Sequence, residues 1–432
     1  MSDNPFLLKI KLKQHTPMIH FQSEQAGATL RATELKPKLD EFLITECFGG
    51  YLDIDSYSPY LIGKTVDDIN KIKSGLVSIE KKYLLDDNNR RKEDEALENL
   101  KVDHLKKQKL AFNYKVKITV GDVSVSSIKA KYPSFFANMG NENKEKFFSF
   151  ATGVTIEFFS LKTELIKKIK EFLPDFLLFH NFGTRQSKGF GSFYIDTNDS
   201  LSGLDLEYSF NVDVSRAGNE SKKIEEVFKQ IELFYKCLRS GVNLKDGRGN
   251  TTFYCKSLIF KYAKDKLGIQ WEKKKIKQEF FLQDMKDQIR EHNSPDTLVS
   301  SDKEHLVKDL LGLSTNENWR SYRAGITKKH KNGEIDRFKS PIFFKPMRIN
   351  NDTFKVYFDV DVFDEKIFGQ TFEIRTKGAR NAIELDTPKD FDYYEFLDFV
   401  CDSKSVDISK HIDFDYHDTN EFEVLENIFN QL

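Results

Sequence analysis

Hydrophobic and polar residues alternate in some stretches of the chain and recur every three to four positions in others. Phe6–Lys13, FLLKIKLK, alternates and predicts a strand, whereas leucines after Thr29 recur at helical spacing. Leu110–Val120 and Phe148–Ser160 have strand character, and Lys162–Phe179 has helical periodicity. A glycine-rich loop and a further strand follow. The order strand, helix, strand, strand, helix, strand is typical of a ferredoxin-like fold.

The second half of the chain repeats this order with a long interruption. Leu204–Val214 predicts a strand and Lys222–Arg239 a helix. A basic, helical insertion is expected over about 240–337, and two strands follow at SPIFFKPM and DTFKVYFDVDVF. The pattern therefore predicts an α+β protein with two ferredoxin-like, RRM-like domains that carry helical insertions.

The length of 432 residues exceeds what one hydrophobic core usually holds, which favours two domains. We place them at 1–200 and 201–432. The stretch 51–109 is strongly charged and has too little apolar periodicity for a core of its own, so it is expected to be a partly helical insertion in the first domain.

Composition indicates a globular protein, with 39% hydrophobic and 31% charged residues and 39 Phe. No apolar run approaches the roughly 20 residues that cross a bilayer, and the first residues lack a secretory pattern, so we expect no membrane partner and a cytoplasmic location. The four cysteines are too scattered for a metal knuckle or a disulfide framework, and we expect reduced thiols.

The net charge of −1 conceals an uneven distribution. The segment 384–432 holds 14 Asp and Glu against 3 Lys, a net charge of −11. The rest of the chain has 64 basic and 54 acidic residues, a net charge of +10. A cationic body is compatible with a polyanionic partner, and the acidic C-terminal segment with a basic neighbouring subunit; solvated surface charge is the alternative.

The loop HNFGTRQSKGFGSFYI, residues 180–195, combines three glycines with two cations. Glycines leave backbone N–H groups uncovered, and Arg185 and Lys188 place positive charge beside them, so the loop is suited to hold phosphate. An ordinary tight turn, with Phe190 in the core, accounts for the same residues.

Three stretches resemble a known family. TPMIHFQSEQAGATLRATELKPKL and GTRQSKGFGSF are similar to the opening segment and the glycine-rich loop of the RAMP superfamily of CRISPR proteins. With DRFKSPIFFKP they most resemble the first subunit of the Cmr effector complex of type III systems. They cover about a tenth of the chain, in the expected order and at the expected element boundaries.

The resemblance implies a noncatalytic RNA-binding subunit in antiviral defence. Such a protein lies near one end of the assembly, contacts CRISPR RNA or target RNA, and associates with other type III effector subunits. No cofactor is implied. Glycines permit close approach to a ribose-phosphate chain, cations bind its oxygens, and Phe190 is placed to stack on a splayed base.

The predicted RNA-binding residues are glycines, one aromatic residue and cations in or near basic loops and at the start of the first helix. The alternative for the cations is an exposed helix face or a solvated loop. The set is Arg31, Lys36, Arg185, Lys188, Gly189, Phe190, Gly191, Arg248, Arg320, Arg323, Lys328, Lys329 and Arg337.

Two other functions stay open. Related RAMP proteins that process repeat RNA use a histidine as general acid or base, and His15, His20 and His180 lie near the two glycine loops. A metal-independent endoribonuclease is therefore the first alternative, and a protein interaction platform within the complex is the second. The sequence has no Walker A, HExxH or GxSxG pattern and no zinc-spaced His/Cys cluster, so we assign no metal.

Overall fold

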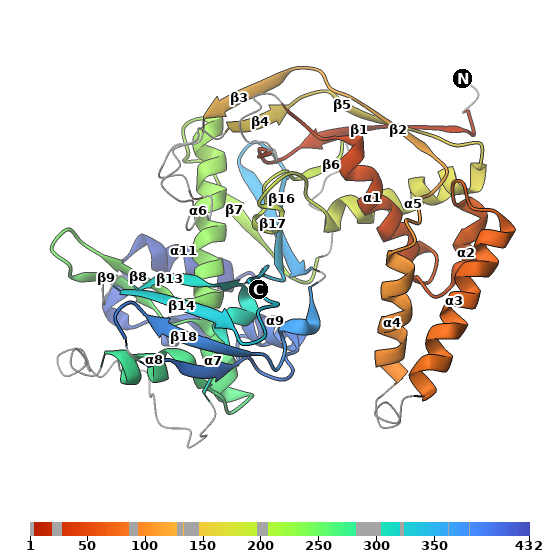
Figure 1. Cartoon of the computed structure of the whole chain (residues 1–432). Helices are drawn as coiled ribbons and strands as arrows, with labels where there is room; N and C mark the ends of the chain where they lie inside the picture. The colour runs from red at the N-terminus through yellow and green to blue at the C-terminus, as the bar shows by residue number, and fades with distance from the viewer. Residues whose placement is uncertain are drawn as a thin grey trace. The chain divides into compact units, whose positions relative to one another are not determined.

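A computed structural model describes residues 4–19, 28–85, 94–127, 133, 147–196, 206–281, 304–319, 324–361, 363–379 and 381–432 (Figure 1). The chain divides into two compact units. The first contains Met1–Lys129, Asn143–Gln186 and Phe190–Asp199. The second contains Ala130–Glu142, Ser187–Gly189 and Ser200–Leu432, so the glycine loop contributes to both units.

The first unit is built on a four-stranded antiparallel sheet in the order β2-β5-β1-β6. In chain order its elements are β1 (Leu7–Gln14), α1 (Ala32–Phe42), β2 (Lys115–Thr119), β5 (Val154–Phe159), α5 (Thr163–Phe179) and β6 (Phe193–Ile195). This is the strand order of a ferredoxin-like fold, as the periodicity predicts. A separate hairpin, β3 (Val123–Ser127) with β4 (Phe147–Ala151), lies between β2 and β5 in the chain.

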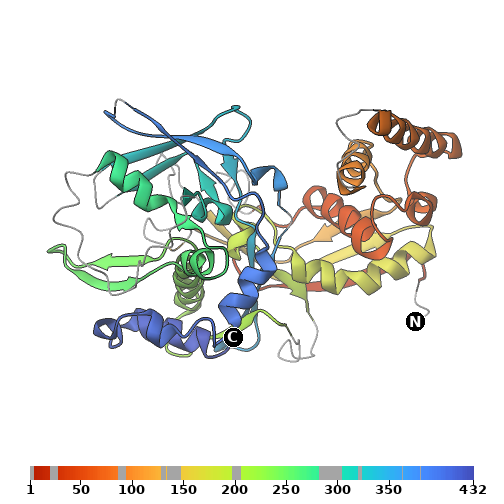
Figure 2. The same ribbon diagram turned by 90° about the horizontal axis from the view of Figure 1, so that it is seen from below.

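One face of this sheet is covered by helices. Strand β1 buries Leu8 and Leu12, and β5 buries Ile156 and Phe158. In Figure 1, α1 and α5 lie on one side of the sheet, and Figure 2 shows these helices, orange-red and yellow, in front of it. Each large side chain buried fully there contributes about 1.5–3 kcal/mol. The alternate residues of each strand must therefore point to the opposite face.

The charged insertion of the first unit is helical where the structure describes it. The π-helix η1 (Leu43–Cys47) precedes it, and the insertion itself contains α2 (Ile54–Tyr57), the 3₁₀-helix η2 (Ser58–Tyr60), α3 (Val66–Leu85) and α4 (Asp94–Lys106). Helices α3 and α4 lie side by side (Figure 1). They bury Ile72, Leu97 and Leu105 between the charged positions, so the insertion has a small apolar seam that its composition concealed.

The second unit contains a three-stranded sheet in the order β16-β17-β7. Strand β7 (Ser209–Asp213) leads to helix α6 (Glu220–Arg239), and β16 (Ile342–Arg348) and β17 (Thr353–Val360) follow much later. These are the first three strands of the ferredoxin-like order. The backbone of Asn211 in β7 exchanges two hydrogen bonds with the side chain of Gln431, at 2.7 and 3.2 Å, which satisfies the strand edge at that point.

The expected helical insertion of the second unit contains strands as well as helices. Its helices are α7 (Leu258–Asp265), α8 (Glu272–Phe280) and the 3₁₀-helix η7 (Lys308–Leu311). Its strands are β8 (Val242–Lys245), β9 (Thr251–Cys255), β10 (Gln270–Trp271), β11 (Glu304–His305), β12 (Leu313–Ser314), β13 (Asn316–Trp319), β14 (Ala324–His330) and β15 (Arg337–Phe338). Strands β10, β11, β13 and β14 join β18 (Thr371–Thr376) and β19 (Ile383–Asp386) in a six-stranded sheet.

The acidic C-terminal segment is folded into the second unit. It forms α9 (Tyr393–Cys401), α10 (Ile408–His411), the 3₁₀-helix η10 (Phe414–Tyr416) and α11 (Asn420–Phe429). Several of its carboxylates are helix caps: Asp392, Asp407 and Asp413 each accept a backbone N–H of the helix that follows. In the described part of the chain, no helix combines the length and apolarity needed to cross a membrane.

Candidate nucleic-acid interface

The two sequence stretches that carry the RAMP resemblance meet in the first unit. The N–H of Thr184 donates to the carbonyl of Ile19 at 2.7 Å, and the N–H of Gly191 donates to the carbonyl of Pro17 at 2.9 Å. The N–H of His15 donates to the carbonyl of Ser192. The TP turn and the glycine loop are therefore hydrogen-bonded to each other along their length.

The glycines of the loop are required by this close packing. Gly191 has φ +69°, and a Cβ atom there would collide with the carbonyl oxygen of Phe182. Gly183 has φ +85°, and a Cβ there would lie 2.6 Å from the carbonyl oxygen of Ile19. The N–H groups of both glycines are used within the protein. In this conformation these two N–H groups are therefore not open to a phosphate, and the alternative of a tight turn describes the two glycines better.

The first turn of α1 also binds the glycine loop. The N–H of Gly183 donates to Glu34 Oε1 at 2.7 Å, so a carboxylate already occupies this part of the loop. Lys38 Nζ donates to the carbonyl of Asn181 at 2.9 Å and to Gln186 Oε1 at 2.6 Å. The helix and the loop are thereby held together within the first unit, in a structure that we call the RAMP junction: residues 15–19, the start of α1, and residues 181–186 and 190–192.

Two of the predicted arginines lie at the RAMP junction. Arg31 is exposed at the residue before α1, and Arg185 is half-buried in the loop. Arg185 has φ +61°, in the left-handed region that residues other than glycine seldom adopt. The hydrogen bond between Gly183 and Glu34 lies close to both arginines in the sequence. Glu34 is three residues after Arg31, and Gly183 is two residues before Arg185. The structure thus brings these two cations to the same part of the first unit.

Lys36, predicted from the same helix, faces the protein interior instead. Its Nζ donates to the Asp40 carboxylate at 2.9 Å and to the carbonyl of Phe112 at 2.9 Å, and lies 3.7 Å from the centre of the Tyr114 ring. Burial lowers the pKa of Lys36, although Asp40 opposes this effect. This lysine anchors α1 to the core, because i and i+4 side chains meet on a helix.

Lys188 and Phe190 are buried. Lys188 Nζ lies 3.3 Å from the centre of the Tyr235 ring within the second unit. Burial raises the pKa of Tyr235, but Lys188 and Arg239 lower it, and their effect prevails. Phe190 is fully buried and stacks on Phe148 with ring centres 5.7 Å apart. These two side chains therefore cannot contact RNA in this conformation. Phe190 lies in the core, as the tight-turn alternative predicts.

Gly189, the residue between them in the sequence, packs within the second unit. It has φ +90°, and a Cβ there would lie 2.7 Å from the ring of Pro346. Its neighbours on both sides are buried, so it serves the packing of the loop and not an exposed backbone surface.

The histidines of the endonuclease alternative are held in the protein or lie outside the described residues. His15 is buried. The His180 ring stacks on Phe176 with centres 4.5 Å apart, and its Nδ1 is 2.8 Å from the Phe176 carbonyl oxygen. His20 is outside the described residues. The contacts of His180 match a structural histidine.

Of the cations predicted in the second half, Arg248, Lys329 and Arg337 are exposed. Arg248 lies at the tip of the β8–β9 hairpin, where the Asp246 carboxylate accepts the N–H of Arg248 and that of Asn250, both at 2.8 Å. Arg320 and Arg323 lie outside the described residues. These three exposed cations come from separate elements, β8–β9, β14 and β15.

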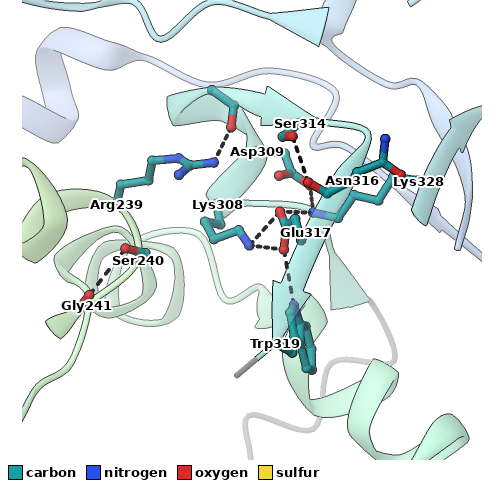
Figure 3. Close-up of polar contacts among 11 residues, drawn as sticks. Arg239, Ser240, Gly241, Lys308, Asp309, Ser314, Asn316, Glu317, Trp319 and Lys328 are labelled. Carbon is teal, nitrogen blue, oxygen red and sulfur yellow. Dashed lines mark hydrogen bonds and ion pairs between the residues drawn. The ribbon is translucent and has the colours of Figure 1, made fainter. Parts of the chain in front are cut away.

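Lys328, next to Lys329 in the sequence, is part of a buried ion cluster (Figure 3). Its Nζ lies 2.6 Å from Asp309 and 2.8 Å from Glu317, and its side chain is 1% exposed. Glu317 also binds Lys308 at 2.7 Å and accepts the indole N–H of Trp319 at 3.2 Å. We call Lys308, Asp309, Glu317 and Lys328 the ion cluster. The prediction that Lys328 contacts RNA does not fit this burial, because its ammonium group is paired inside the protein.

The charges of the ion cluster stabilise each other. Burial disfavours the charge on Lys328, but Asp309 and Glu317 raise its pKa. Glu317 has its pKa lowered by Lys308 and Lys328, against the effect of burial. The nearby Glu272 is fully buried, and burial raises its pKa to about 7. Two lysines are thus matched by two carboxylates, with Glu272 as a third acid beside them.

A set of exposed lysines lies on the uncovered face of the first sheet. None of them is among the RNA-binding residues predicted from the sequence. Its members, here called the lysine face, are Lys9, Lys11, Lys13, Lys115 and Lys117. The signal was present in the alternation of FLLKIKLK and KVKIT, which places every lysine of these two strands on one side.

The four cysteines are free thiols, of which Cys237 and Cys255 are buried while Cys47 and Cys401 are half-buried. Cys237 and Cys255 are buried with their sulfur atoms 3.3 Å apart. The hydrogen bond from Cys237, with a contribution from His411, lowers the pKa of Cys255 to about 6. Among the residues that the structure describes, no group of three or more His, Cys, Asp or Glu side chains is arranged to hold a metal ion.

Comparison with known proteins identifies the family. The Cmr1 N-terminal domain matches residues 6–242, and the Cmr1 C-terminal domain matches residues 254–421. No curated protein matches the chain. The chain is similar to the crystal structure of Cmr1 from Pyrococcus furiosus in its apo form, with 13% sequence identity and a TM-score of 0.29. The match covers 83% of this chain and 89% of the other. On the strength of the two domain matches, the chain belongs to the Cmr1 family of RAMP proteins and is a subunit of the type III Cmr complex.

Proposed function

We propose that this subunit binds RNA without cleaving it, contacting guide RNA or target RNA near one end of the Cmr complex. The observation that carries the proposal is the RAMP junction, where an exposed Arg31 and a half-buried Arg185 lie on two segments joined by the Glu34–Gly183 hydrogen bond. Arginine suits this role because its planar guanidinium donates paired hydrogen bonds to phosphate oxygens.

Contacts to the phosphate backbone of RNA make binding depend on salt concentration. Each phosphate that a cation neutralises releases condensed counterions, so the binding constant falls as salt rises. For single-stranded RNA, each phosphate contact adds about −0.7 to the slope of log K against log salt concentration. Such contacts fix the position of an RNA without reading its bases. We therefore expect salt-dependent binding with little sequence preference, to which the exposed Arg248, Lys329 and Arg337 contribute.

The test compares two double variants of the full chain. Arg31→Glu with Arg185→Glu is expected to weaken binding of a labelled single-stranded RNA about tenfold or more and to reduce the salt slope by about 1.4. Lys162→Glu with Lys170→Glu, exposed on or beside α5, makes the same charge change elsewhere and serves as the control. Fluorescence anisotropy at several salt concentrations gives both quantities.

Two outcomes would reject the proposal. Affinity that is insensitive to salt and to the arginine variant would favour the interaction platform, with RNA contacts belonging to neighbouring subunits. Site-specific cleavage of labelled repeat RNA in EDTA, lost on His15→Ala, His20→Ala or His180→Ala, would instead favour the endoribonuclease.

A further inference from the structure

The lysine face occupies the side of the first sheet that α1 and α5 leave uncovered. Along β1, Leu8 and Leu12 point to the helices, so Lys9, Lys11 and Lys13 point away from them. The register pairs Lys9 with Glu157, and Glu157 with Lys117, across three adjacent strands. The side chains of Lys9 and Lys117 are 60% and 70% exposed.

This face is strongly cationic. Five lysines share it with two carboxylates, Glu157 and Asp196, which leaves a net charge of +3. Asp196 follows β6 and lies opposite Lys11, whose carbonyl accepts the Asp196 N–H at 2.9 Å. Glu157 lies 2.9 Å from Lys9 and 3.9 Å from Lys117. Within the described residues, no carboxylate lies at ion-pairing distance from Lys11, Lys13 or Lys115. A surface charge excess of this size attracts a polyanion and repels other cations.

One end of the face is apolar. Leu7 in β1 is paired with Phe159 in β5, and their exposed fractions are 40% and 41%. Leu161, two residues beyond, is 75% exposed. An aromatic ring that stays in water beside a row of lysines is typical of surfaces that stack nucleobases while they neutralise the backbone.

We infer that the lysine face binds single-stranded RNA, with the phosphates along β1 and a base on Phe159. This inference rests on the proposed function, because both need RNA in the complex, but it assigns a different surface. Lys9, Lys11 and Lys13 recur every second residue, about 7 Å apart along the strand, so one extended backbone can pass all three. A duplex keeps its bases stacked inside and has none to offer Phe159.

The first experiment separates charge from position. Lys9→Gln, Lys11→Gln and Lys13→Gln together remove three predicted phosphate contacts, so the salt slope for a single-stranded RNA should fall by about 2. The control is Lys162→Gln, Lys167→Gln and Lys170→Gln, three exposed lysines on or beside α5 in the same unit, and it should leave the slope unchanged. Equal slopes for the two triple variants would overturn the inference.

The second experiment tests the aromatic contact. Phe159→Ala should weaken the RNA complex about tenfold with no change in salt slope, because stacking releases no counterions. Phe159→Trp keeps a ring and should retain the affinity. Loss in the tryptophan variant as large as in the alanine variant would refute a stacking role.

The third experiment predicts a gain. Glu157→Gln removes the carboxylate that pairs with Lys9 and Lys117 and so frees both lysines, and RNA binding should tighten about two- to fivefold. Binding that is unchanged or weaker would contradict the assignment.

The tests distinguish this inference from the proposed function. If the arginine variant weakens binding and the β1 triple variant does not, the proposed function stands and the lysine face is not an RNA surface. If the wild-type chain binds no RNA, the proposed function fails first. Competition by poly-L-glutamate as strong as by RNA of equal charge would show an acidic protein ligand and overturn the inference.

Discussion

The lysine face and the ion cluster use the same residue type in strands of similar alternation, with opposite results. In β1 three lysines alternate with apolar residues, of which Leu8 and Leu12 are buried and Ile10 is half-buried, and all three lysines are exposed. In β14 the adjacent Lys328 and Lys329 point to opposite faces, and only Lys329 is exposed. The difference lies in what covers each sheet face, since α1 and α5 leave one face of the first sheet open while Asp309 and Glu317 enclose Lys328.

A buried lysine is retained only where its charge is balanced. The cost of removing an ammonium group from water amounts to several kcal/mol, and nearby carboxylates offset it when their geometry is good. Lys328 has two such partners, and Glu317 shares its second oxygen with Lys308. A basic stretch of sequence can thus mark an internal ion cluster as readily as a polyanion site.

The largest expected effect comes from breaking the ion cluster. Lys328→Ala leaves Asp309 and Glu317 with an uncompensated buried charge, and the free energy of unfolding should fall by about 3–5 kcal/mol. Urea denaturation with a probe in the second unit measures this. Lys329→Ala, at the next position on the exposed face, should change stability by less than about 0.5 kcal/mol. Similar losses in both variants would remove the distinction drawn between the two lysines.

A second effect depends on pH. Burial raises the pKa of Glu272 from 4.5 to about 7, so the folded protein holds this proton more tightly than the unfolded chain does. The stability that this provides is complete below about pH 4.5 and is lost as pH rises through 7. As the pH rises from 4.5 to 8, the free energy of unfolding of Glu272→Gln should therefore increase by about 3 kcal/mol relative to that of the wild type.

The measurement for Glu272 is the difference in unfolding free energy between variant and wild type at several pH values. Because the glutamine does not titrate, effects of other groups cancel in the difference. Glu157→Gln on the exposed lysine face is the matched control and should show a far smaller pH dependence. A difference for Glu272→Gln that is flat from pH 4.5 to 8 would contradict the pKa assignment.

The smallest effect is expected at the lysine face itself. Lys9→Ala or Lys117→Ala breaks an exposed ion pair with Glu157, and such solvent-screened pairs contribute little to stability. Melting temperatures should stay close to wild type while RNA binding weakens. A large loss of stability would indicate a structural role and argue against a binding surface.

Much of the first unit follows from local pattern. The alternation in β1 and the helical spacing in α1 and α5 predict the elements, and their order predicts the sheet that forms. The strands of the insertion in the second unit were missed, and β14 shows why. Its sequence AGITKKH contains a lysine at a buried position, so polarity did not alternate where burial did.

The sequence alone determined the α+β class, the ferredoxin-like order of the first sheet and the family. The hydrogen bonds that join residues 15–19 to the glycine loop were not predicted from the sequence. Only the tertiary structure decided which charges and rings reach solvent. Lys188, Phe190 and Lys328 are buried and Lys36 is half-buried, because a residue's exposure depends on partners distant in the chain. These partners include Tyr235, Phe148, Asp309 and Phe112.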